Sequence, residues 1–401
     1  MRYDVIVVGG GPAGSTTARE CAVRGLSVLL LDKAAFPRDK PCGGGITLRA
    51  ARLLPFDLAP VTERSISGLD LTFSRRAGFA RDADRPLFHL VQRSRFDHFL
   101  VEQAVKCGAT LREGMPLRSM ERDRGGIVVR AGGETFEGRT LVAADGANGE
   151  TAKQAGLTLP RWRIIAMEGN ITPNGPFPDR WRRRGGIDLG GVAGGYHWLF
   201  PKGDHLNIGI GGLPSVGSTL RRRLEAAVRA YGFDPAALWG VRAATIPIRR
   251  PDAPLVEGHL LLVGDAAGLA DLLTGEGIYG AIWSGRAAAH HLAAYLAGET
   301  PTLQGYREEI ERALLPELQI AFQMWAFFHF APVVAANLLW RRSAGKVCRL
   351  IGWTRFCRLI QGEDRYIDLK NDFGLLWRPV DWVLRPSVFP FVSKILERFQ
   401  R

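Results

Sequence analysis

The chain opens with a short apolar segment that breaks abruptly into glycines. Residues 5–8 are all apolar, Gly9, Gly11 and Gly14 follow, and a helical pattern covers residues 15–24. This order predicts a buried strand, a tight turn and the start of a helix. Because such glycines permit the turn, the approach of a pyrophosphate and close helix packing, the segment predicts a dinucleotide-binding unit.

A second predicted strand extends this unit. Residues 27–31 lead into Asp32, eighteen positions after Gly14. An acid there can bind ribose hydroxyl groups and would repel a 2′-phosphate, so NADPH is disfavoured in this pocket. We expect Pro12, Ala13 and Lys33 to lie beside the same dinucleotide. The alternative is a plain βαβ unit whose glycines are only structural.

The composition is that of a folded chain with several packed units. Of its 401 residues, 46% are apolar and 23% are charged, which leaves room for two or three units around a large core. Glycine is unusually frequent, and its 48 residues cluster at 9–14, 43–45, 185–195, 209–212 and 275–280. We expect these clusters to approach a ligand.

The five cysteines argue against a disulfide framework and against a metal site, because their number is odd and no C-x-x-C spacing occurs. A reducing compartment is therefore expected. No cationic leader precedes an apolar segment of signal-peptide length. We expect a cytoplasmic monomer.

The net charge of +13 indicates that a negatively charged molecule could bind the protein. Nucleic acid, anionic lipid and a pyrophosphate-bearing substrate all carry the complementary charge. Nucleic acid is not expected, since no recognisable RNA- or DNA-binding module accompanies the basic residues. A solvated arginine-rich surface without any partner is the alternative.

Periodicity and turn residues divide the chain further. Two prolines and three glycines make residues 36–45 a long loop. Helices are predicted at 47–54 and 96–107, and strands at 68–79, 87–92, 109–112, 126–130 and 140–144. Residues 162–250 show the alternation of a separate sheet, a buried strand returns at 260–263, and the chain is mostly helical after 276.

The fold class predicted from these patterns is α/β, or α+β overall. A discontinuous Rossmann-like domain is expected over residues 1–75, 92–160 and 250–300. A mostly antiparallel β substrate domain is expected over 76–91 and 161–249, and a helical, basic and aromatic region over 301–401. No second G-x-G-x-x-G occurs, so a dedicated NAD domain is disfavoured.

Four further segments carry a family resemblance: Pro41-Cys-Gly-Gly-Gly45, Arg93-Ser-Arg-Phe-Asp97, Ala144-Asp-Gly-Ala147 and Gly264-Asp-Ala-Ala-Gly268. With the N-terminal glycines, they resemble the FAD-dependent oxidoreductases of the para-hydroxybenzoate hydroxylase fold over residues 1–290. The resemblance implies FAD as the cofactor, with Asp265 on the flavin ribitol and Arg93 on the phosphates or ribitol. It also implies that the helix behind Asp265 directs its dipole toward the flavin. A helix N-cap is the alternative role for Asp265.

The remaining expected cofactor contacts lie in the N-terminal unit, in these motifs and in the glycine cluster at 275–280. They are Gly9, Gly11, Pro12, Ala13, Gly14, Asp32, Lys33, Cys42, Gly43, Gly44, Asp145, Gly264, Gly275, Gly277 and Ile278.

Two segments resemble one branch of this fold, the geranylgeranyl reductases: the loop Pro41–Gly45, and Tyr196-His-Trp-Leu-Phe-Pro201 followed by Gly209-Ile-Gly211. On a strand, Tyr196, Trp198 and Phe200 share one face and His197 lies on the other, where a structural role is expected. An aromatic wall suits a polyprenyl chain, although core packing is the alternative. The catalytic residues implied are Cys42, Gly43, Gly44, Tyr196 and Trp198.

The resemblance implies saturation of C=C bonds in a geranylgeranyl or other polyprenyl group, with NADPH or another donor as a transient reductant of FAD. A twenty-carbon chain would gain on the order of 10–15 kcal/mol on burial before ordering costs, which favours an enclosed tunnel. The rival functions are a flavin-dependent monooxygenase or halogenase of the same fold, and a non-catalytic isoprenoid-binding flavoprotein. The halogenase signature Trp-x-Trp-x-Ile-Pro is only partly matched, because tyrosine stands first here.

The C-terminal region combines aromatic and basic residues. Phe322, Trp325, Phe327, Phe328 and Phe330 are expected to form a second wall or the mouth of the tunnel. Residues 320–340 are long enough to span a bilayer, but Gln323, His329, Pro332 and Asn337 disfavour spanning. Peripheral contact with the inner face of a membrane stays possible through Arg341, Arg342, Lys346 and Arg349, and through Trp377, Trp382, Phe389 and Phe391 beside Arg378 and Arg385.

Overall fold

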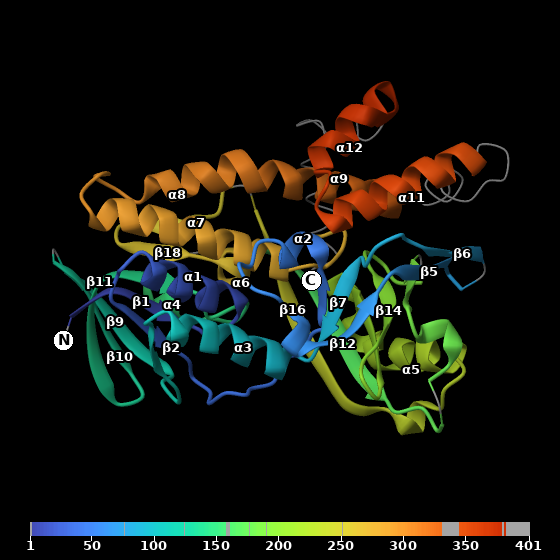
Figure 1. Ribbon diagram of the computed structural model, residues 1–401, viewed down its shortest axis with the longest axis horizontal. Helices are drawn as coiled ribbons and strands as arrows, with labels where there is room; N and C mark the ends of the chain where they lie inside the picture. The colour runs from blue at the N-terminus through green and yellow to red at the C-terminus, as the bar shows by residue number, and fades with distance from the viewer. Residues whose placement is uncertain are drawn as a thin grey trace.

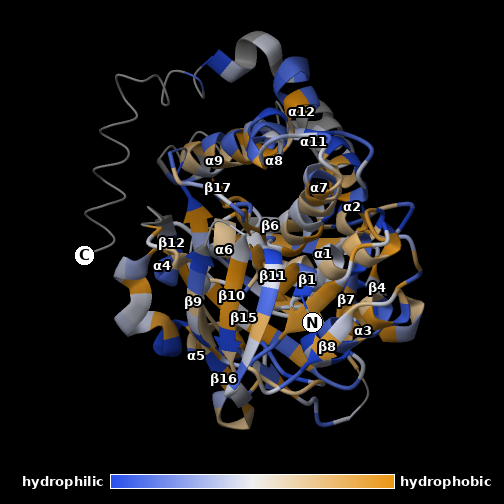
Figure 2. Cartoon of the chain, turned by 90° about the vertical axis from the view of Figure 1, so that its left-hand side faces the viewer, coloured by the Kyte–Doolittle hydropathy of each residue, from blue (hydrophilic) through white to orange (hydrophobic). Residues whose placement is uncertain are grey.

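The computed structural model describes residues 2–75, 77–123, 125–157, 161–175, 177–189, 191–250, 252–330, 345–378 and 381. A helix-covered sheet lies on one side of the molecule and a second sheet on the other, and the C-terminal helices run across the top (Figure 1). Hydrophobic stretches follow the inner strands, and hydrophilic ones gather on outer helices and loops (Figure 2).

The first sheet holds the predicted dinucleotide unit. Its strands lie in the order β17-β18-β11-β1-β2-β8, and β10 pairs with β11 and β9. Pairing is parallel between β1 and β2, β1 and β11, β11 and β18, and β2 and β8. The bounds are β1 Arg2–Val8, β2 Val28–Leu31, β8 Thr110–Arg112, β9 Leu117–Asp123, β10 Gly126–Ala131, β11 Glu134–Ala143, β17 Val256–Glu257 and β18 Leu260–Leu262.

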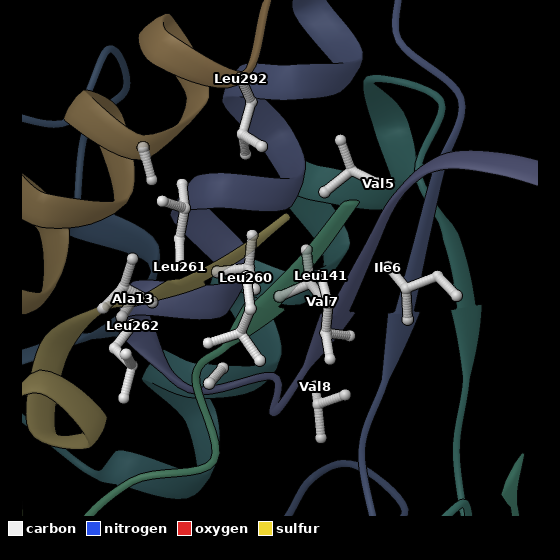
Figure 3. Packing of buried hydrophobic residues seen from close by; sticks show 14 of the residues in the cluster. Val5, Ile6, Val7, Val8, Ala13, Leu141, Leu260, Leu261, Leu262 and Leu292 are labelled. Carbon is white, nitrogen blue, oxygen red and sulfur yellow. The ribbon is translucent and has the colours of Figure 1, made fainter. Parts of the chain in front are cut away.

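Helices α1 (Pro12–Val23), α3 (Arg93–Lys106) and α7 (Ile278–Leu296) cover this sheet, with α1 packed against both others. The core between sheet and helices is aliphatic: Val5, Val7, Leu141 and Leu261 are fully buried and lie with Leu292 of α7 (Figure 3). The all-apolar strands are explained by this burial, since a parallel sheet is normally covered on both faces.

The second sheet is mostly antiparallel, as predicted, with order β16-β12-β15-β14-β13-β5-β6. Only β5 and β13 pair in parallel. The bounds are β5 Gly68–Phe73, β6 Ala77–Asp82, β12 Arg161–Ile171, β13 Arg184–Leu189, β14 Tyr196–Pro201, β15 Leu206–Gly212 and β16 Trp239–Arg249. Helix α5 (Leu220–Ala230) packs on the face formed by Leu199, Ile208 and Ile210.

A small three-stranded sheet, β3-β7-β4, is a further unit that the sequence did not reveal. Its strands are β3 Gly45–Thr47, β7 Phe88–Val91 and β4 Thr62–Ile66, and α2 (Leu48–Ala51) follows β3 directly. The predicted helix at 47–54 is thus shorter, and Thr47 caps it by accepting the Ala50 N–H at 3.1 Å. The predicted strand at 68–79 is instead the β5–β6 hairpin, so the predicted break after residue 75 falls between two strands of the second sheet.

The region after 300 is helical where the structure describes it. The helices are α8 Gln304–Glu309, a π-helical segment Ile310–Leu314, α9 Leu315–Phe330, α11 Gly345–Gln361 and α12 Tyr366–Phe373. Among the described residues, none of the helices has both the length and the apolar character needed to cross a bilayer. The predicted roles of Pro332, Asn337, Arg341, Arg342, Trp382, Arg385, Phe389 and Phe391 lie outside the described residues, as do the side chains of Phe328, Phe330, Lys346 and Arg349.

Candidate active site

A cavity of about 1420 Å³ joins the first sheet to the second. A site for one small ligand commonly encloses about 300–1,000 Å³, so this cavity has room for a cofactor and a second ligand. Its walls come from the N-terminal glycine turn, the loop at 40–45, the loop at 271–278, the second sheet and the C-terminal helices.

One end of the cavity is built by the start of α1. Gly11 precedes the helix in extended conformation and offers no side-chain cap, and Pro12 occupies the first turn. The first helical N–H groups are therefore available to an anion. At Gly14, an added Cβ would lie 1.8 Å from the Gly9 carbonyl oxygen, so only glycine allows α1 to pack this closely on β1. Gly9, with φ +105, permits the turn and Gly14 permits the close helix packing, while the approach of a pyrophosphate at Gly11 stays a prediction.

Acidic and basic side chains surround the glycine turn. Asp32 Oδ2 accepts the Gly10 N–H at 2.8 Å and pairs with Arg38 Nε at 3.2 Å. Arg38 also reaches Asp97 at 3.1 Å, and Arg93 binds the same carboxylate with two bonds of 2.8 Å. Asp32 is thus fixed in position beside the turn, and Arg38, which sequence reasoning missed, adds positive charge there.

The loop at 40–45 and the turn at Asp265 both line the cavity. Asp265 lines it and pairs with Lys40 at 3.1 Å. The helix at Asp265, α6 (Gly264–Ala267), has four residues, because the chain turns to left-handed φ at Gly268. That a helix behind Asp265 directs its dipole at the flavin stays a prediction. The long helix that starts beside the cavity is α7, after Gly277.

The loop at 42–44 is held by charged residues of the second sheet. Cys42 N–H donates to Glu168 Oε1 at 2.8 Å, and Lys202 Nζ donates to the Gly43 carbonyl at 2.5 Å. Burial raises the pKa of Glu168, against the opposing effect of the Cys42 N–H and Lys202. Burial also lowers the pKa of Lys202 to about 8, although Cys42, Glu63 and Glu168 oppose this.

The aromatic wall lies across from this loop. Tyr196, Trp198 and Phe200 all line the cavity, as the alternation on β14 predicts. The Tyr196 hydroxyl donates to the Thr274 carbonyl, and Trp198 Nε1 donates to Asn207 Oδ1 at 2.8 Å. His197 points away and lies buried 3.5 Å from Asp188, which agrees with a structural role.

A buried polar cluster backs the loop at 271–278. Glu276 accepts the Thr47 hydroxyl at 2.6 Å and pairs with Arg49 at 3.2 Å. The Tyr366 hydroxyl of α12 donates to Asp271 at 2.7 Å. Burial raises the pKa of Glu276, opposed by Arg49 and Thr47. These bonds fasten the C-terminal helices to the loop beside the predicted flavin position.

The part of the cavity formed by the second sheet and the C-terminal helices, called the apolar limb, is lined mainly by apolar side chains. Its side chains come from the second sheet and from α9, α11 and α12, and the described ones include Leu69, Leu71, Phe73, Phe79, Ile187, Leu189, Met324, Trp325, Trp353, Phe356, Leu359, Ile360 and Leu369. Of the predicted C-terminal aromatics, Trp325 lines this limb and Phe322 packs on Trp162 at its side.

The structure brings most predicted site residues to one cavity. Lining it are Gly11, Pro12, Ala13, Cys42, Gly43, Gly44, Arg93, Tyr196, Trp198, Asp265, Gly275, Gly277 and Ile278. Gly9, Gly14, Asp32 and Gly264 lie behind that wall. Two predicted contact residues do not line the cavity: Lys33 is exposed, and Asp145 lies between the lining residues Ala144 and Gly146. One oxygen of the Asp145 carboxylate accepts the backbone N–H and the hydroxyl of Thr151 at the start of α4 (Thr151–Gln154).

The residues present fit FAD. The free N–H groups at the start of α1 suit the pyrophosphate, Asp32 suits a ribose, and the glycine-lined space between 42–44 and 275–277 suits a flat ring. The residues that sequence reasoning missed are Arg38, Lys40, Glu168, Lys202 and Glu276. For three of them a signal existed, because Arg38 and Lys40 lie in the predicted loop and Glu276 lies between two predicted glycines.

Comparisons with known proteins agree with this geometry. Residues 2–182 match the FAD binding domain family. The chain is 34% identical over 322 residues to a geranylgeranyl diphosphate reductase from Rhodobacter capsulatus, covering 75% of this chain and 78% of the relative. It is 33% identical over 319 residues to a menaquinone reductase from Mycolicibacterium smegmatis, covering 72% and 76%.

Solved structures share the fold. A geranylgeranyl bacteriochlorophyll reductase-like protein from Thermoplasma acidophilum aligns with a TM-score of 0.75 at 22% identity, over 93% of this chain and 98% of the other. A flavin-dependent brominase aligns with a TM-score of 0.71, also at 22% identity, over 90% and 94%. Reductases and halogenases therefore use the same architecture.

Proposed function

Because the chain belongs to the geranylgeranyl reductase family of FAD-dependent oxidoreductases, we propose that it saturates C=C bonds of a geranylgeranyl or other polyprenyl group. The group would be carried on a lipid, a diphosphate, a chlorophyll or a quinone. The observation that carries the proposal is the single cavity, which runs from the FAD-binding loops past Tyr196 and Trp198 into an apolar limb. A polyprenyl chain is the ligand class that such a limb favours.

FAD, when bound and reduced, would supply the hydride for an alkene that nothing activates. The protein would position the alkene and exclude water from the reacting bond. Trp198 and Phe200 cover the loop at 42–44, since a Cβ added at Gly43 would lie 3.0 Å from atoms of both rings. With the apolar limb filled, water is displaced from the reacting bond, which suppresses side reactions.

Cys42 and Tyr196 are two cavity-lining residues whose side chains carry a proton, one on the loop at 42–44 and the other on the aromatic wall. The Cys42 thiol accepts the Gly44 N–H at 3.4 Å, so it is held on the same loop. The Tyr196 hydroxyl already donates to Thr274, and burial raises its pKa above the ordinary value. We therefore favour Cys42 as the proton donor and Tyr196 as part of the wall.

The decisive experiment mixes dithionite-reduced protein with geranylgeranyl diphosphate without oxygen. Reoxidation of the flavin and a product heavier by two hydrogens per reduced bond support the proposal. A product that contains oxygen or halogen, formed only when air and halide are supplied, supports the monooxygenase or halogenase instead. Tight binding of the prenyl compound without flavin reoxidation supports a non-catalytic binding protein.

A second anaerobic experiment identifies the electron donor. We propose NADPH as the transient reductant. FAD would occupy the pocket beside Asp32, and a second, transient site for NADPH does not require a glycine motif of its own. Anaerobic bleaching of the flavin by NADPH at a rate that saturates with NADPH concentration is the expected result. Bleaching by a reduced ferredoxin or quinol but not by NADPH would contradict it.

A further inference from the structure

Two charged residues of the second sheet form hydrogen bonds with the backbone of the loop at 42–44, one on each side of the Cys42–Gly43 peptide. Glu168, on β12, accepts the Cys42 N–H at 2.8 Å. Lys202, just after β14, donates to the carbonyls of Gly43 at 2.5 Å and Val91 at 2.9 Å. The loop that approaches the flavin is therefore fixed by a different sheet from the one that carries the dinucleotide turn.

The same Glu168 carboxylate also reaches the aromatic wall. Its second oxygen accepts Asn207 Nδ2 at 3.4 Å, and Asn207 Oδ1 accepts Trp198 Nε1 at 2.8 Å. One carboxylate thus connects the backbone at Cys42 with the indole of Trp198. A change at Glu168 would move both sides of the space between loop and wall.

The Cys42–Gly43 peptide group, which lies between these two hydrogen bonds, has no hydrogen-bond partner in the part of the chain that the structure describes. Within the described part of the chain, neither the Cys42 carbonyl nor the Gly43 N–H has a hydrogen bond, and both residues line the cavity. Once a ligand displaces water from them, such groups need a new partner, because unpaired buried peptide groups are rare and costly.

We propose that Glu168 and Lys202 are positioning residues that present the Cys42–Gly43 peptide to the flavin ring and hold Trp198 in register with it. This rests on the proposed function, since Trp198 is taken to cover the substrate. Lys202 is buried, and Glu168 is half-buried at the cavity wall. Their attraction only partly offsets the cost of removing them from water, so their main effect is on position and not on stability.

The test compares Glu168→Ala, Glu168→Gln and Lys202→Met with the wild type, all reconstituted with FAD. A hydrogen bond to a charged group contributes about 1.5–3 kcal/mol, so Glu168→Ala and Lys202→Met should each raise the FAD dissociation constant about tenfold or more. Both should also shift the flavin absorption spectrum and its midpoint potential. Glu168→Gln keeps an acceptor for Cys42 N–H and should recover most of the affinity.

Asp188→Asn is the matched control. Asp188 is a buried carboxylate of the same sheet that binds Thr72 and Arg75 and does not line the cavity. The Asp188→Asn variant should have a lower free energy of unfolding than the wild type. Its FAD dissociation constant should stay within twofold of the wild-type value, and its flavin spectrum and midpoint potential should not shift.

The proposal is overturned if the Glu168 and Lys202 variants bind FAD with wild-type affinity and spectrum. It is also overturned if Asp188→Asn changes these readouts as much, because general damage to the sheet would then explain them. None of the measurements uses a prenyl compound. A wild type that binds FAD but fails to reduce geranylgeranyl diphosphate would therefore refute the proposed function and leave this inference to be judged on its own readouts.

Discussion

Gly275 is the point where the loop beside the flavin touches the aromatic wall, and replacing it should disturb both. Gly275 has φ +68, and an added Cβ would lie 2.9 Å from the Tyr196 hydroxyl oxygen. Left-handed backbone costs an alanine about 1–2 kcal/mol. If Tyr196 is pushed off the Thr274 carbonyl, about 0.5–1.5 kcal/mol more is lost. We expect Gly275→Ala to lower the free energy of unfolding by about 1.5–3.5 kcal/mol.

The backbone and contact contributions can be separated. Gly25 has φ +81, and an added Cβ there would meet open space, so Gly25→Ala should cost only about 1–2 kcal/mol. Tyr196→Phe removes the hydroxyl that the new methyl group would meet. In that background, Gly275→Ala should cost about 1 kcal/mol less than in the wild type, as a double-mutant cycle would show.

The assay is urea unfolding at a fixed excess of FAD, with the FAD dissociation constant measured in parallel. Gly275→Ala should weaken FAD binding, whereas Gly25→Ala should not, because only Gly275 lines the cavity. The reasoning is refuted if the two alanine variants lose equal stability and Tyr196→Phe shows no coupling with Gly275→Ala.

Three further predictions concern charged and polar groups of the site. Asp265→Ala should weaken FAD retention about tenfold, because the carboxylate lines the cavity beside Lys40; unchanged flavin content after dialysis would contradict its assignment. The pKa of Lys202 is lowered to about 8 from 10.5, so the unfolded chain binds more protons between these values. Relative to Lys202→Met, wild-type stability should therefore rise from pH 8 to 10.5, by up to about 3 kcal/mol, and parallel curves would disprove the shift. Tyr366→Phe should lower the free energy of unfolding by about 1–3 kcal/mol, since Asp271 loses a buried partner; a change below 0.5 kcal/mol by urea unfolding would show that water replaces the hydroxyl.

Local patterns predicted the parts of the site that depend on neighbouring residues. The strand, turn and helix at residues 2–23 follow from an apolar segment and the spacing of glycines. The alternation at 196–200 placed Tyr196 and Trp198 on the cavity and His197 behind them. In both cases the period of a single element decides which way a side chain points.

Contacts between distant segments could not be predicted in this way. Glu168 lies 126 residues from Cys42, and Glu276 lies 229 residues from Thr47, so each pair depends on how sheets and loops pack. The contact of Asp145 with Thr151 could not be predicted either, because it depends on where the short helix α4 begins after the turn. Asp265 lies on the cavity, as predicted, but the helix at Asp265 ends at Gly268, where the backbone turns to left-handed φ.

The insertion of the second sheet between β11 and β18 governs when the cofactor site can form during synthesis. Val142 pairs with Leu261, and Asp265 follows directly after β18. The ribosome must therefore release all of β12–β16 before the first sheet gains β18 and before the loop at 271–278 exists. Pairing of such distant strands is slow, because long loops must close first. We therefore expect FAD to bind late, after the second sheet has left the ribosome.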